Sequence, residues 1–302
     1  MKHSYRSILL LVRKAITKYI KDDPIRLSGT TAFFMLLAVA PIVIIMTNMA
    51  GMLIDQNLVT EKVLAQTEAM IGPQGREYIQ MLIESSGKSK DQSLVRSLVG
   101  IGIFIGISTT LFHVVQNAIN YIWRVRSKPQ NNLLQTLKDR TLSFGLLLSI
   151  GLIMLITLLL DAGISLLDDY LSATFPTATV ILIRSLHLIV SFGVATLIFA
   201  LIYRFLPDAR IKWHVTWIGA LITAALFTIG KFIIGALLGS SGLADLYGAA
   251  GSIVIVLLWF FYSSIIFYFG AEITQQYGEI YAKDIQPQNH AVRIKITEVS
   301  DQ

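Results

Sequence analysis

Cysteine is absent from this chain, and charged side chains are scarce, at 15% of its 302 residues. The absence of cysteine excludes disulfide bonds, thiolate metal sites and a cysteine nucleophile. A soluble globular domain carries about 25% charged residues, so this chain has too few charges to cover a surface that faces water. With 54% hydrophobic residues and a mean hydropathy of +0.64, the composition predicts an integral membrane protein.

Motifs that carry catalysis are also missing. The sequence has no GxxxxGK[ST] phosphate loop, no GxSxG nucleophile motif and no HExxH zinc motif. The five histidines, at positions 3, 113, 187, 214 and 290, are scattered and predict no metal cluster. We therefore expect no cofactor and no enzymatic activity.

Long apolar runs, by contrast, are plentiful. A membrane-spanning helix needs about 20 mostly apolar residues. Six segments have about this length or more: residues 27–54, 97–123, 141–160, 178–203, 213–238 and 252–269. The fourth and fifth segments each contain a lysine or an arginine. We expect an all-α, polytopic membrane bundle of about six transmembrane helices.

Lysine and arginine lie mostly on one side of this six-span topology. They precede the first span, follow the sixth, and fill the loops between the second and third and between the fourth and fifth spans. On the other side they occur only in the loop 55–96. Because basic loops stay inside, we expect both termini in the cytoplasm. The net charge of +6 then reflects topology, and no nucleic-acid partner is expected.

The chain divides into three expected parts. Residues 1–22 form a cytoplasmic amphipathic helix that either lies on the anionic leaflet or packs as a cap under the bundle. Its apolar positions recur at helical spacing: Tyr5, Ile8, Val12, Ile16 and Tyr19. Residues 23–281 form the transmembrane domain, with an outer helical hairpin at 55–96 that is a lid, a docking surface or a plain connector. Residues 282–302 form a polar cytoplasmic tail, expected to be disordered.

Several residues are expected to shape the backbone. Asp23 caps a helix that begins at the following proline, and Pro41 predicts a kink inside that first span. Gly248 and Gly251 belong to a glycine-rich segment before the last span. This segment is either a simple outer turn or irregular backbone that lines a cavity.

Polar side chains share one face of the second span: His113, Gln116, Asn117 and Asn120. Inside a membrane such residues face the bundle interior. They either join helices by hydrogen bonds or line a wet cavity open toward the cytoplasm. The sequence leaves both uses open.

Charged residues also fall inside or at the ends of spans. Arg184 and His187 lie on one stripe near the outer end of the fourth span. Arg184 either extends toward the membrane surface or pairs with Asp168 or Asp169, and Lys231 of the fifth span also has the surface within reach. If Arg184 and Lys231 instead point inward, the two cations would suit an anionic lipid headgroup. Glu272 is expected at the cytoplasmic end of the last span. Because a carboxylate is unfavourable at a helix C-terminus, a cationic partner is expected, with Arg26 or Arg204 as the candidates.

Four segments in order resemble the YihY/BrkB family of bacterial inner-membrane proteins. They are Asp23–Pro41, Asn117–Trp123, the Tyr203–Asp208 run YRFLPD with Pro207 as a structural residue, and the run from Tyr247-Gly248-Ala249-Ala250-Gly251 to Phe269-Gly270-Ala271-Glu272. The resemblance covers about residues 15–280. It implies a multi-pass protein of the bacterial inner membrane.

The resemblance also implies candidate functions. Members have carried the label ribonuclease BN, which the residues here do not support because no histidine–acid cluster is present. Others are linked to envelope integrity or lipid export. Two readings follow: a transporter or flippase of a lipid-like or anionic amphiphile, or a non-transporting structural or assembly factor of the envelope. The expected partners are membrane lipids in the first case and other envelope proteins in the second.

Overall fold

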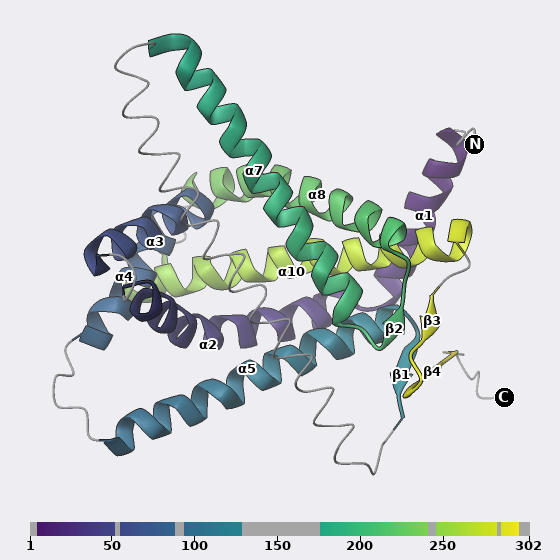
Figure 1. Cartoon of the computed structure of the whole chain (residues 1–302), viewed down its shortest axis with the longest axis horizontal. Helices are drawn as coiled ribbons and strands as arrows, with labels where there is room; N and C mark the ends of the chain where they lie inside the picture. Colours follow the sequence, from purple (N-terminus) through teal and green to yellow (C-terminus); the bar gives the residue numbers. More distant parts are fainter. Residues whose placement is uncertain are drawn as a thin grey trace. The chain divides into compact units, whose positions relative to one another are not determined.

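A computed structural model describes residues 5–51, 55–87, 94–128, 176–240, 246–282 and 285–295, and these residues are mostly helical (Figure 1). The chain folds into two compact units. Unit 1 consists of residues 1–24, 115–226 and 266–302, and unit 2 consists of residues 25–114 and 227–265. Helices α5, α8 and α10 each contribute residues to both units.

Four helices of the described chain are long and apolar enough to cross a membrane. The apolar stretches are Pro24–Val43 of α2 (Pro24–Gly51), Leu188–Phe205 of α7 (Pro176–Phe205), Trp213–Ile234 of α8 (Trp213–Ser240) and Gly251–Tyr281, which starts with α10 (Gly251–Tyr277). Helix α5 (Leu94–Ile122) covers the expected second span, and the expected third span, 141–160, lies outside the described residues. The helical membrane class is confirmed, while the count of six and the orientation stay predictions.

Two short antiparallel strand pairs belong to unit 1. Strand β1 (Val125–Ser127) pairs with β4 (Ala291–Arg293), and β2 (Ala209–Arg210) pairs with β3 (Gln286–Pro287), as Figure 1 shows. The expectation of a disordered tail is therefore wrong for residues 285–295. The strands that order this segment come from loops far away in the sequence.

The apolar core of unit 1 includes a contact between its first and last helices. Leu11 and Ala15 of α1 (Tyr5–Lys21) pack with Ile273 of α10, beside Phe269. The indole Nε1 of Trp123 donates a hydrogen bond of 3.0 Å to the carbonyl of Ala271. The apolar contact holds α1 against α10, and the hydrogen bond attaches the end of α5 to the same helix.

Unit 2 contains the helix pair α3 (Gln56–Ile71) and α4 (Pro73–Gly87). Asp55 caps α3, since its carboxylate accepts hydrogen bonds from the backbone of Asn57 and Leu58. Glycine 72, with φ of 91°, forms the turn between the two helices. A buried apolar cluster joins them to α2 and α10: Val43, Leu64, Tyr78, Ile79 and Val256.

The expected backbone residues fall at helix boundaries, with one exception. Helix α2 begins at Pro24, as predicted, and Asp23 before it has a left-handed φ of 54°. Gly248, with φ of 52°, opens a single 3-10 turn, η1 (Gly248–Ala250), and α10 begins at Gly251. The left-handed φ explains a glycine at 248. Pro41 lies inside α2, and its kink stays a prediction.

Candidate functional site

Helix α1 has two separate apolar faces. Leu11, Ala15 and Tyr19 are buried, with 0–8% of each side chain exposed. Each of these is followed by an apolar residue that is 38–67% exposed, and the three form a second row: Val12, Ile16 and Ile20. The sequence grouped Val12, Ile16 and Tyr19 on one face, but the structure buries only Tyr19 of these three. One face of α1 therefore packs on the protein while another remains uncovered within the described chain.

Lys18 anchors α1 to the last helix. Its Nζ lies 3.0 Å from Oε1 of Glu272, whose side chain is fully buried. The same ammonium group donates hydrogen bonds to Oε1 of Gln275 and, at 3.2 Å, to the carbonyl of Ile122. Gln276 donates a further hydrogen bond of 3.0 Å to the Glu272 carboxylate. Three segments of the chain meet at this ion pair.

The predicted partners of Glu272 were wrong. Arg26 is exposed, and the guanidinium of Arg204 lies over the ring of Trp213, 5.3 Å from its centroid. Helix α10 continues to Tyr277, so Glu272 does not end the helix but faces α1 from its side. The partner is Lys18 of the amphipathic helix α1, and the sequence did not predict this pairing.

A second ion pair lies at the end of α1. Arg124 Nη2 is 2.5 Å from Oδ1 of Asp22, which is buried. In the first pair, burial lowers the pKa of Lys18 below its ordinary value, and the nearby Glu272 carboxylate opposes that shift. Within the described residues, Asp22 Oδ2 and Glu272 Oε2 are buried without a hydrogen-bond partner. Removing one member of such a buried pair leaves an uncompensated charge.

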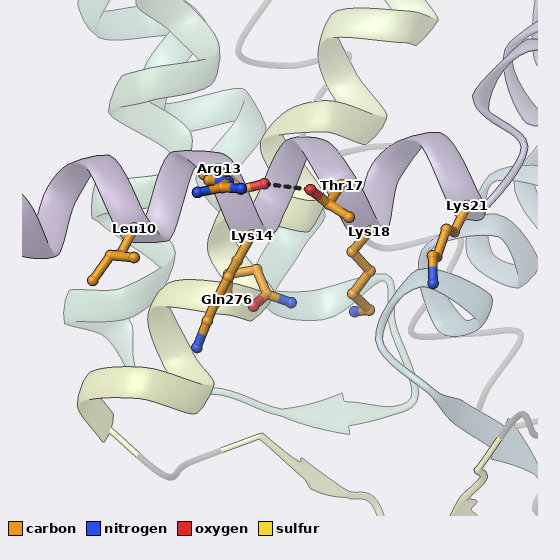
Figure 2. A pocket seen from close by; sticks show the side chains of 7 residues that line it. All are labelled: Leu10, Arg13, Lys14, Thr17, Lys18, Lys21 and Gln276. Atoms are coloured by element: carbon orange, nitrogen blue, oxygen red, sulfur yellow. Dashed lines mark hydrogen bonds between the residues drawn. The ribbon is translucent and has the colours of Figure 1, made fainter.

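A groove of about 480 Å³ runs along α1 beside these ion pairs. Figure 2 shows Lys14, Lys18 and Lys21 extending from one side of the helix. The residues that line the groove are Leu10, Arg13, Lys14, Thr17, Lys18, Lys21 and Gln276. The lining therefore carries four cationic side chains and no acidic one.

Asp208 forms a second polar centre of unit 1. Its carboxylate accepts hydrogen bonds from Asn120 Nδ2 at 2.7 Å, from Gln116 Nε2 at 3.3 Å and from the hydroxyl of Ser127. His290 Nε2 lies 3.0 Å from the same carboxylate. The backbone N–H of Asp208 donates to Asn120 Oδ1 at 2.9 Å. One acid therefore connects the end of α5, strand β1 and the C-terminal segment.

Pro207 belongs to the same centre, because its carbonyl accepts a hydrogen bond of 3.2 Å from Gln288 Nε2. The backbone N–H of Gln288 donates to the Asp208 carbonyl at 2.9 Å. The C-terminal segment therefore contacts the loop that contains Pro207 and Asp208 through both the side chain and the backbone of Gln288.

The polar face predicted on the second span divides in the structure. Gln116 and Asn120 are hydrogen-bond partners of Asp208, as in the joining use of such residues. His113 and Asn117 are exposed. Arg184 and His187 lie on α7, but their side chains are outside the described part of the chain. Lys231 lies in unit 2, half-buried, with its ammonium 5.3 Å from the ring centroid of Phe232.

The sequence did not predict Asp22, Asp208 or the pairing of Lys18 as organising groups. A usable signal was present for Asp208, since it is an acid in the short loop between two apolar runs and ends the quoted YRFLPD segment. Within the ranges that the structure describes, no three histidine or acidic side chains could together hold a metal ion.

Four described helices that are long and apolar enough to cross a membrane are the mark of a multi-pass membrane protein. A family model described as virulence factor BrkB matches residues 15–295. The chain belongs to this family.

Its relatives are membrane proteins as well. A UPF0761 membrane protein of Psychromonas ingrahamii is 27% identical, with 91% of this chain and 88% of the relative covered. A UPF0761 membrane protein of Aliivibrio salmonicida is 25% identical over 83% of this chain and 78% of its own length. One from Photobacterium profundum is 25% identical over 87% and 80%, respectively. No solved structure matches the chain.

Proposed function

We propose that this protein lies in the bacterial inner membrane, with both termini in the cytoplasm, and moves a lipid-like anionic amphiphile between leaflets. The supporting observation is helix α1, which carries both an exposed apolar row, Val12, Ile16 and Ile20, and a groove lined by cations. A helix of this kind lies in the interface of an anionic leaflet, with its apolar side among the acyl chains.

The anchoring of α1 supports a role beyond simple membrane attachment. Lys18 joins α1 to Glu272 in the last apolar helix, so an amphiphile bound at α1 would lie beside a helix that crosses the membrane. Lys231 is a cation within another apolar helix, α8, and is the second residue that we propose contacts the amphiphile.

A structural or assembly factor of the envelope is the second candidate. The observation in its favour is the Asp208 network, in which Gln116 and Asn120 are occupied by hydrogen bonds. Residues engaged in this way hold segments together and are not available to a passing substrate.

A leaflet assay separates the two candidates. The purified protein is reconstituted in liposomes that contain fluorescent lipid in both leaflets, and an impermeant reductant is added outside. Lipid transfer predicts bleaching beyond the outer leaflet. We expect Lys231→Ala to slow the second phase, while Lys62→Ala, which removes a cation from the helix pair α3–α4, leaves it unchanged.

Bleaching that stops at the outer leaflet, in liposomes shown to contain folded protein, would refute unassisted lipid transfer and favour the structural role. Equal slowing in both variants would remove Lys231 from the path.

A further inference from the structure

We propose that the groove on α1 is a binding site for the phosphate headgroup of an anionic membrane lipid. The placement of α1 at the cytoplasmic leaflet rests on the proposed function, but binding at the groove does not require transport. A phosphate diester carries one negative charge and several acceptor oxygens, which match a lining of ammonium groups.

The charge balance of the groove favours an anion. Lys18 is compensated by Glu272 at 3.0 Å. For Arg13, Lys14 and Lys21, the described part of the chain provides no ion pair, although all three line the groove. Gln276 adds an amide from α10, and this residue is itself held by its hydrogen bond to Glu272. The groove therefore has uncompensated positive charge beside a fixed polar wall.

The neighbouring apolar residues favour a lipid over a free phosphate. Leu10 lines the groove and is 55% exposed, and the same helix carries the exposed apolar row Val12, Ile16 and Ile20. Large apolar side chains gain free energy by leaving water for acyl chains. A free phosphate would use the cations and leave these side chains in water, whereas a lipid uses both.

The test compares two variants that remove the same charge. Lys14→Gln/Lys21→Gln removes two cations from the groove, and Arg126→Gln/Lys128→Gln removes two exposed cations from β1 and the residue after it. The full-length protein in mild detergent is titrated with phosphatidylglycerol or with neutral phosphatidylcholine, and bound lipid is counted by native mass spectrometry. Thermal unfolding of each variant checks that it is folded.

We expect wild type to prefer phosphatidylglycerol and the groove variant to bind it about 25-fold more weakly, at about fivefold for each cation. The control variant should bind like wild type. Ile16→Ser should weaken the binding of phosphatidylglycerol, and inorganic phosphate in excess should compete only weakly with the lipid.

Equal binding of the two lipids, or equal loss in the groove and control variants, would overturn the site. Full competition by inorganic phosphate, with no effect of Ile16→Ser, would show a free-phosphate site and refute the lipid assignment. Selective lipid binding without leaflet transfer would refute the proposed transport while the headgroup site stands. Leaflet transfer together with unchanged lipid binding in Lys14→Gln/Lys21→Gln would refute the headgroup site while the proposed transport stands.

Discussion

Unit 1 and unit 2 are stabilised by different kinds of contact. In unit 1, buried charges and amides join distant segments: Lys18 contacts Glu272, and Asp208 accepts hydrogen bonds from Gln116 and Asn120. In unit 2, the described core is an apolar cluster around Val43 and Val256. The ion pair between Glu68 and Arg76 there is exposed, and exposed pairs contribute little.

The difference shows which contacts determine position as well as stability. Apolar packing depends mainly on area and shape, so it tolerates exchange among residues of similar volume. A buried carboxylate requires particular partners at particular distances. Unit 1, which contains both ends of the described chain, uses the second kind of contact to attach α1 and the C-terminal strands.

The strongest test of this comparison is removal of the Lys18 ammonium. Lys18→Ala leaves the Glu272 carboxylate buried without its cation, which costs about 3–5 kcal/mol of unfolding free energy. Denaturant unfolding in mild detergent measures the loss. We expect Lys18→Met/Glu272→Gln to recover most of it, because both charges are then removed. A single-variant loss below about 1 kcal/mol would show that the pair does not stabilise unit 1.

The next largest effect is expected at Asp208. Asp208→Ala removes the carboxylate that accepts from Asn120 and Ser127, while Gln116 keeps its hydrogen bond of 3.0 Å to the Leu206 carbonyl. Hydrogen bonds to a charged group contribute about 1.5–3 kcal/mol, so we expect a loss of about 3 kcal/mol. Limited proteolysis should cleave the C-terminal segment first, since His290 also loses its contact. Asp55→Ala is the matched control in unit 2, where loss of a helix cap costs about 1 kcal/mol. Unchanged proteolysis in Asp208→Ala would contradict the prediction.

Close packing in unit 2 gives a smaller effect. A methyl group added at Gly230 would collide with the Tyr262 hydroxyl, so Gly230→Ala should cost about 1–3 kcal/mol through overpacking. At Gly106 nothing lies within 4 Å of the added carbon. Gly106→Ala should therefore be neutral or stabilise its helix by up to about 1 kcal/mol. Thermal unfolding of the two variants compares them, and equal shifts would exclude a packing effect at Gly230.

The smallest effect is a pH dependence from Tyr78 in the unit 2 cluster. Burial raises the pKa of its phenol above 10.0. The unfolded chain then loses this proton first, so the contribution to stability is complete below about pH 10 and falls as the pH rises through the folded-state pKa. Tyr78→Phe should reduce the alkaline decline in unfolding free energy, whereas the exposed Tyr247→Phe should not. Identical pH profiles for the two variants would contradict a contribution of the Tyr78 phenol to the pH dependence of stability.

The tail and the first helix show why part of the site could not be predicted. Residues 285–295 are polar, and polar composition alone indicates disorder. Their order comes from pairing with β1 and β2, which are too short to be recognised from sequence. On α1, helical spacing predicted an amphipathic helix, and the helix is present. Which apolar row is buried depends on the surface of α10 that contacts it.

Composition and apolar runs by themselves determined that the chain is a helical membrane protein, because burying uncharged segments in lipid requires only length and hydrophobicity. The positions of several helices followed from the same pattern, as did the start of α2 at Pro24. Only the tertiary structure decided that Glu272 pairs with Lys18 and that Asp208 gathers Gln116 and Asn120. Two charges attract each other strongly only when the fold brings them within a few ångströms, and the separation of two residues along the chain does not give their distance in space.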